Sequence, residues 1–273
     1  MKLSLSVRVV ESFSNKREVR IQLPELARIA CEAGYDALCL RASMLGIQDS
    51  AEKVTEVTEI LKQHGLGVSM ITGDFAVPEN GSSGPGCLRN ITPYLDLAEY
   101  VGADLIRICM KSDEDITWAT KASAEAGERA IRLAHQSHTK SLFETVAGSK
   151  KTVERVDNQY FGIIYEPANL ALCGEDYGQK TLETFRSFLF NVYLQNHVPE
   201  ENGPQPMETW ARGLVDSRLY PLNSGEGIDF ESVFSGLKAI DYRGYVTLHH
   251  AFDGSLEPEV AAARSALFLR NLM

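Results

Sequence analysis

The feature that most constrains the fold is a regular alternation of short apolar segments with longer amphipathic segments along all 273 residues. The apolar segments have the length and composition of β-strands, and the amphipathic segments have the apolar period of α-helices. The strand-like segments are residues 3–7, 37–40, 67–71, 104–110, 141–144, 162–165, 192–194 and 244–248. Eight strands with helices between them, and no linker or low-complexity tract, predict one (β/α)8 TIM barrel domain over residues 1–273.

A doubly wound open sheet is the main alternative to the barrel. Such sheets usually carry a glycine-rich turn after the first strand, where the phosphates of a dinucleotide bind. This chain lacks that turn, which favours the barrel and predicts that no nucleotide cofactor is used.

Charge and composition narrow the function classes. The formal net charge is −10, from 27 basic and 37 acidic residues. A surface that acidic argues against nucleic-acid and anionic-membrane partners. No apolar stretch is long enough for a membrane span, and the five cysteines show no paired metal spacing. Buried free thiols fit a reducing compartment, so the expected location is the cytoplasm.

Several charged and polar side chains are predicted to point into the barrel, because successive residues of a strand face opposite sides. Charges inside a barrel need partners, a metal or a wet pocket. Internal ion pairs and a functional pocket at the carboxyl ends of the strands both remain open. The predicted inward-facing residues are Arg41, Arg107, Lys111, Glu144, Glu166, Tyr193, Gln195 and His249.

The long connection over residues 199–227 is predicted to be a loop at the mouth of the barrel. Trp210 and Tyr220 lie in this connection and would be apolar groups at the surface. They could form a homodimer contact or fold back over the pocket, and the sequence does not choose between these alternatives.

Three sets of segments resemble the xylose isomerase-like TIM barrel superfamily, the sugar phosphate isomerase/epimerase family. They are residues 165–170 (YEPANL) with 174–176 (GED), 225–230 (GEGIDF), and 242–248 (YRGYVTL). The resemblance implies a divalent metal held by a Glu, an Asp, a His and a Glu at the ends of strands five to eight. It also implies that two carboxylates move protons on carbons next to a carbonyl.

Carried onto this sequence, the four ligand positions become Glu144, Glu166, Tyr193 and His249, and Asn169 lies three residues after the strand-six carboxylate. Neutral tyrosine is a poor ligand for Mg²⁺ or Mn²⁺, but two glutamates and a histidine could hold Zn²⁺ or Mn²⁺. The resemblance therefore implies Glu144, Glu166 and His249 as metal ligands.

The resemblance implies an isomerase or epimerase that acts on a sugar, keto-sugar or sugar acid through an enediolate. The expected acid and base groups are Glu144 and His249. A dehydratase or lyase, and a barrel that binds a sugar or a partner without turnover, are the alternatives. The expected substrate-binding residues are Arg41, Arg107, Lys111, Glu166, Asn169, Tyr193 and Gln195.

Overall fold

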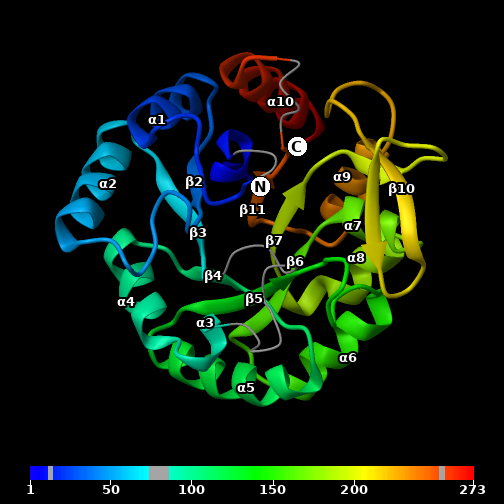
Figure 1. Ribbon diagram of the computed structural model, residues 1–273, viewed down its shortest axis with the longest axis horizontal. Coiled ribbons are helices and arrows are strands. Elements are labelled where there is room, and N and C mark those ends of the chain that lie inside the picture. The colour runs from blue at the N-terminus through cyan, green and yellow to red at the C-terminus, as the bar shows by residue number, and fades with distance from the viewer. Residues whose placement is uncertain (12–14, 74–85, 252–255) are drawn as a thin grey trace.

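Eight parallel strands close into a barrel surrounded by helices (Figure 1). The computed structural model describes residues 1–11, 15–73, 86–251 and 256–273. The strand order around the barrel is β1-β11-β7-β6-β5-β4-β3-β2. The predicted (β/α)8 barrel is confirmed. Its strands are β1 Lys2–Ser6, β2 Ala37–Leu40, β3 Gly67–Thr72, β4 Leu105–Ile108, β5 Arg132–Gln136, β6 Phe161–Tyr165, β7 Leu189–Leu194 and β11 Tyr245–Leu248.

The helices begin and end where local sequence signals place them. Helix α4 ends at Gly102, whose φ of 72° is a left-handed conformation that glycine adopts without strain. Helix α5 begins at a capping box formed by Ser112 and Asp115. The helices are α1 Leu23–Glu32, α2 Ala51–Gln63, α3 Gly86–Arg89, α4 Thr92–Val101, α5 Asp113–Glu128, α6 Val146–Val156, α7 Pro167–Leu172, α8 Gln179–Phe185, α9 Phe230–Ala239 and α10 Pro258–Leu272, with the short 3₁₀ turns η1 Val7–Val10 and η3 Arg186–Phe188.

The fifth strand corrects the prediction from sequence. Residues 141–144 are not a strand; the fifth strand of the barrel is β5, which ends at Gln136. Helix α5 stops at Glu128, and Ala130 follows with a left-handed φ of 54° that reverses the chain into β5. The apolar pair at 142–143 misled the prediction because Phe143 is a core residue of a turn, stacked on His135 at 4.3 Å.

The connection after β7 is a small antiparallel sheet rather than an irregular loop. It contains β8 His197–Pro199, β9 Gln205–Thr209 and β10 Gly213–Leu219, in the order β8-β10-β9. Figure 1 shows it at the side of the barrel next to α7. Trp210, which is 53% exposed, lies at the turn between β9 and β10. It points to solvent and does not fold back over the pocket.

Two apolar clusters hold the barrel together. The larger fills the layer between strands and helices, and the smaller fills the inside of the barrel. Two polar pairs complete the interior, Ser4 with Ser69 at 2.6 Å and Thr247 with Asn191 at 2.9 Å. Within the described ranges, no helix has the length and apolar character needed to cross a membrane. The smaller cluster consists of Cys39, Met70, Leu105, Ala134, Ile164 and Tyr193.

Candidate functional site

The alternation of side chains along the strands determines which residues point into the mouth of the barrel. Side chains two residues apart on a strand share a face, so a residue two positions after an interior residue also points toward the barrel axis, nearer the mouth. Cys39, Leu105, Ala134, Ile164 and Tyr193 belong to the interior cluster. The residues two positions later are Arg41, Arg107, Gln136, Glu166 and Gln195, and His249 follows Thr247 of β11 in the same way.

These residues surround a cavity of about 190 Å³. Five of the predicted site residues line it: Arg41, Arg107, Asn169, Gln195 and His249. Glu166 and Tyr193 are fully buried beneath them. The other lining residues are Arg8, Lys16, Gln136, His138, His197, Gln205, Met207, Leu219 and Ala251.

One half of the cavity is cationic. Arg8 comes from η1 directly after β1, Lys16 from the connection that follows, Arg41 from the end of β2, and Arg107 from β4. Burial is the largest cause that lowers the pKa of Lys16, to about 8, and the positive charges of the three arginines lower it further. Burial also lowers the pKa of Arg8 to about 10. Four cations thus line one cavity, and three of them, Arg8, Arg41 and Arg107, are buried.

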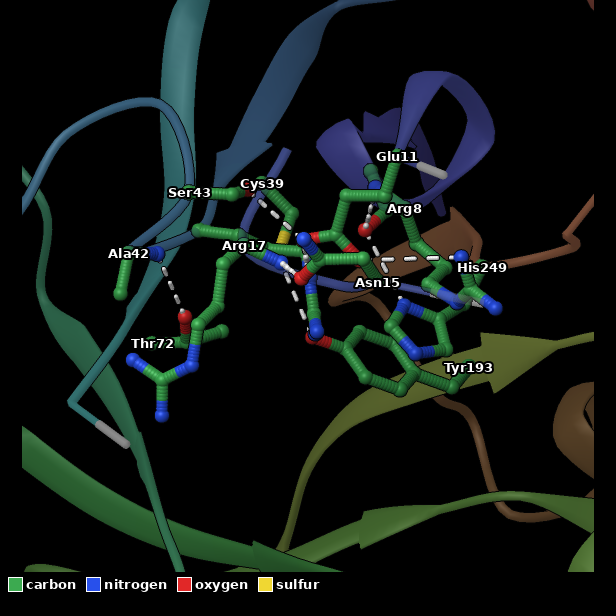
Figure 2. Close-up of polar contacts among 12 residues, drawn as sticks. Arg8, Glu11, Asn15, Arg17, Cys39, Ala42, Ser43, Thr72, Tyr193 and His249 are labelled. Atoms are coloured by element: carbon green, nitrogen blue, oxygen red, sulfur yellow. Dashed lines mark hydrogen bonds and ion pairs between the residues drawn. The ribbon is translucent and has the colours of Figure 1, made fainter. Parts of the chain in front are cut away.

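The carboxylate of Glu11 contacts two of these cations, Arg8 and Arg41. Figure 2 shows Glu11 beside Arg8 and Ser43. Its Oε1 accepts from Arg41 Nε at 2.6 Å and from Ser43 Oγ at 2.7 Å. Its Oε2 lies 3.7 Å from Arg8 Nη1. Glu11 and Arg41 are both buried, at 5% and 3% exposure. The pair is therefore a fixed internal contact.

The opposite half of the cavity carries a buried carboxylate surrounded by amides. Glu166, at the N-terminus of α7, accepts hydrogen bonds from Gln136 Nε2 of β5, from Gln195 Nε2 after β7, and from Asn169 Nδ2 at 2.8 Å. Its pKa is raised to about 7, because burial disfavours the charged form more than the three amides and Arg107 favour it. Glu166 is thus able to exchange a proton near neutral pH.

His249 lies between the two halves and is held on both sides. Its ring stacks on Tyr193 with centroids 3.9 Å apart, as Figure 2 shows. Its Nδ1 lies 3.0 Å from Ser6 Oγ, and Tyr193 Oη lies 3.2 Å from Cys39 Sγ. Burial, and then the charges of Arg41, Arg107, Arg8 and Lys16, lower the His249 pKa well below its ordinary value. His249 is therefore a neutral imidazole that faces the cavity.

Glu144 does not lie in this site, contrary to the prediction from sequence. It follows β5 by eight residues and accepts three backbone N–H groups, from Lys140 at 2.8 Å, Trp210 at 2.7 Å and Ala211 at 2.8 Å. The end of β5, where the resemblance places the first metal ligand, is occupied by Gln136. Glu144 thus fastens the β9–β10 turn to the chain after β5.

Lys111 is also outside the lining of the cavity, and its backbone N–H donates to Asp115 Oδ2 at 2.7 Å. Sequence reasoning missed Gln136 because β5 was placed eight residues too late. It missed Arg8 and Lys16 because both follow the first strand rather than lie in it. An argument from the charged residues just beyond β1 could have found them.

The residues of this site do not fit a divalent metal. Among the described residues, no group of three or more His, Cys, Asp or Glu side chains is arranged to hold one. The carboxylate of Glu166 faces amide N–H donors, and four cationic side chains share the cavity with it. The structure does not bring the predicted ligands Glu144, Glu166 and His249 together: Glu144 lies elsewhere, and the cations that lower the His249 pKa would also repel a dication.

Solved structures with the same fold include enzymes of several kinds. The probable 3-DHS dehydratase of Bacillus anthracis is 16% identical, with 99% of each chain covered and a TM-score of 0.73. The D-psicose 3-epimerase of Clostridium cellulolyticum is 16% identical, with 100% of this chain and 99% of that chain covered and a TM-score of 0.72. A xylose isomerase-like TIM barrel protein of Mycobacterium smegmatis, solved in complex with magnesium, is 14% identical, with 99% and 96% covered and a TM-score of 0.71.

These likenesses show a common fold, because the identities are low. A comparison with curated proteins found no significant match. A family model described as xylose isomerase-like TIM barrel matches residues 27–272, which is most of the chain. The chain therefore belongs to the xylose isomerase-like TIM barrel family.

Proposed function

We propose that this barrel is an isomerase or epimerase that moves a proton on a carbon next to the carbonyl of a carbohydrate or sugar acid. The observation that carries the proposal is the Glu166 carboxylate, buried and with a pKa of about 7, below a cavity that a neutral His249 also faces. A general base works best when its pKa lies near the working pH. The family membership and the epimerases of the same fold support this reaction class.

In this proposal Glu166 takes the proton from the carbon. It reaches the substrate when a substrate hydroxyl replaces one of its amide partners, since catalytic contacts often tighten only in the complex. His249 hydrogen-bonds the carbonyl oxygen, which becomes the oxyanion of the enediolate. Arg107, a buried side chain that lines the same cavity, stabilises that negative charge. Glu166 then returns the proton to the neighbouring carbon while the hydroxyl proton passes to the first oxyanion, which completes an isomerisation. An epimerisation instead requires an acid on the opposite face of the enediolate to protonate the same carbon.

The side-chain amides would select the substrate. Gln136, Asn169 and Gln195 line the cavity and each donates to Glu166. Their remaining donor and acceptor atoms suit the hydroxyl groups of a polyol. A compound without adjacent hydroxyls would leave these buried amide groups unpaired, which disfavours its binding.

The first test is exchange of a substrate hydrogen with solvent. Keto-sugars, sugar acids and sugar phosphates are incubated with the protein in D₂O, and loss of the C–H signal next to the carbonyl is followed by NMR. We expect exchange, and we expect Glu166→Gln and His249→Gln each to slow it by about a hundredfold or more. The control is Glu154→Gln, which removes an exposed carboxylate on α6.

Two outcomes would contradict the proposal. One is a compound that saturates the cavity but shows neither exchange nor conversion, which would leave a binding barrel. The other is exchange that persists unchanged in Glu166→Gln with the fold intact by circular dichroism.

Elimination is the second candidate reaction, favoured by Lys16. Its lowered pKa of about 8 suits an acid that protonates a departing β-hydroxyl from the same enediolate. The same incubation distinguishes the two reactions. A dehydratase forms an unsaturated product that absorbs in the ultraviolet, whereas an isomerase or epimerase conserves the formula of its substrate.

A further inference from the structure

The cationic half of the cavity has more positive charge than its protein partners balance. Arg8, Lys16 and Arg41 line its β1–β2 side, and among the described residues Glu11 is the acidic group in ion-pair contact with Arg8 and Arg41. Three positive charges and one negative charge leave about two in excess. Buried charge of this size is costly unless a counter-charge joins it.

Two guanidinium groups also have buried donors without a hydrogen bond among the described residues. Arg41 Nη1 has no such partner, and Arg8 Nη1 has only the ion-pair contact with Glu11 Oε2 at 3.7 Å. Buried donors of this kind are rare in folded proteins, because each costs about 1–3 kcal/mol when left unpaired. Both belong to side chains that line the cavity and that Glu11 holds in place. The unused donors point to a ligand with acceptor oxygens.

We propose that Arg8, Lys16 and Arg41 form a subsite that binds a doubly negative oxyanion group, and that this group is the handle by which the substrate is held. The second part rests on the proposed function, whereas the binding of the anion is measurable without any reaction. A dianion fits the charge better than a monoanion, because it balances the excess of about two positive charges, whereas a monoanion leaves about one. Arginine suits this task because its planar fork pairs with two oxygens at once.

The position of the subsite gives it a role in the reaction. Its three residues come from η1 after β1, from the connection that follows η1 and from the position directly after β2, whereas Glu166 and its amides come from the end of β5, from the positions directly after β6 and β7, and from α7. In the strand order these groups lie on opposite sides of the barrel, with β11 and its His249 between β1 and β7. A substrate anchored by its dianion at β1–β2 therefore extends across the cavity toward Glu166.

Lys16 provides the sharpest test, because it forms no hydrogen bond or ion pair with the described residues and its charge is repelled by three arginines. Lys16→Met is expected to raise the melting temperature in the absence of anions, since it removes that repulsion. The same variant is expected to weaken the binding of inorganic phosphate by about tenfold or more in calorimetric titrations near pH 7. A residue that served only the fold would show the opposite sign in the melting experiment.

Arg41→Met and Arg41→Lys extend the titrations with inorganic phosphate. We expect Arg41→Met to weaken phosphate binding by about tenfold or more, and Arg41→Lys to restore part of it. The matched control is Arg243→Met, which removes an exposed cation just before β11, at the opposite end of the barrel. Equal phosphate affinity in the wild type, Lys16→Met and Arg243→Met would overturn the subsite, as would a wild-type protein that does not bind any dianion.

Further titrations identify the anion. Phosphate binding stronger than malonate binding assigns a phosphate monoester, and the reverse order assigns a dicarboxylate. Acetate binding as tight as either would overturn the preference for a dianion. Failure of the subsite and failure of the proposed function are distinct: phosphate binding without hydrogen exchange refutes only the reaction, and exchange on a substrate without phosphate binding refutes only the subsite.

Discussion

Glu166 shows how burial sets the chemistry of a carboxylate. Three amides satisfy its oxygens and Arg107 favours its ionised form, but the cost of burial prevails over both. An arginine in place of one amide would keep the group ionised across the neutral range. With amides around it, Glu166 is close to the midpoint of its titration at neutral pH.

The pH dependence of hydrogen exchange follows from two groups. The maximal rate is expected to rise about tenfold per unit below pH 7 and to level off above it, because Glu166 must be ionised to accept a proton. The ratio kcat/KM is expected to rise in the same way and then to fall above about pH 8, as Lys16 loses the charge that binds the substrate. His249 does not add a further change of the rate near neutral pH, since its pKa lies well below the ordinary value.

The measurement is a pH profile of exchange for the wild type and for Lys16→Met. In Lys16→Met we expect kcat/KM to keep its rise below pH 7 and to lose its fall above about pH 8. A maximal rate that falls as the pH rises toward 7 would contradict the role of Glu166.

The direction of a single side chain was predictable from the sequence where the alternation of side chains along a strand determines it. Arg41, Arg107, Gln195 and His249 follow interior residues by two positions, and the alternation of apolar side chains reveals this in the sequence. Gln136 was not predictable, because the apolar alternation of β5 is interrupted by His135, a buried polar residue stacked on Phe143.

At the scale of elements, the β9–β10 hairpin depends on a contact far away in the sequence. The two backbone N–H groups at its turn, those of Trp210 and Ala211, donate to the carboxylate of Glu144, which is 5% exposed. Hairpin residues Gln205, Met207 and Leu219 line the cavity. The carboxylate therefore supports one wall of the site without touching the substrate. No pattern near residue 144 predicts this role, since Trp210 and Ala211 are more than sixty residues away.

Glu144→Ala is expected to lower the free energy of unfolding by about 3 kcal/mol, because three backbone donors lose their acceptor. The maximal rate of hydrogen exchange at saturating substrate is expected to fall less than tenfold. Denaturant unfolding and the exchange assay check both parts, and Glu154→Ala, on the exposed face of α6, is the control. A fall in the maximal exchange rate as large as that expected for Glu166→Gln would indicate that Glu144 is catalytic.

At the scale of the whole molecule, an acidic protein surrounds a basic cavity. The formal net charge is −10, yet the lining of the site contains four cations. The barrel and its strand order were predictable because eight apolar segments at regular spacing leave few other ways to bury a core. The local excess of positive charge was not, since it comes from residues that the fold gathers from separate parts of the chain.

The opposite signs of the surface and the cavity predict the direction of a salt effect. If the local cations govern binding, raising the salt from about 0.05 M to about 0.5 M weakens phosphate binding by about tenfold. If the net charge of the molecule governed it, added salt would screen repulsion and strengthen binding. Titrations of the wild type and Lys16→Met over this range check the sign, and the dependence on salt should be shallower in the variant.

The cavity presents three different kinds of group to a ligand, and their arrangement distinguishes a ligand from its mirror image. Cations at β1–β2, a carboxylate with amides at β5–β7 and an imidazole from β11 are unlike groups at three separate places around the ring of strands. A molecule can satisfy all three in only one sense of rotation, so its mirror image must leave at least one of them unmatched. The arrangement of strands thus imposes stereoselectivity before any bond is broken.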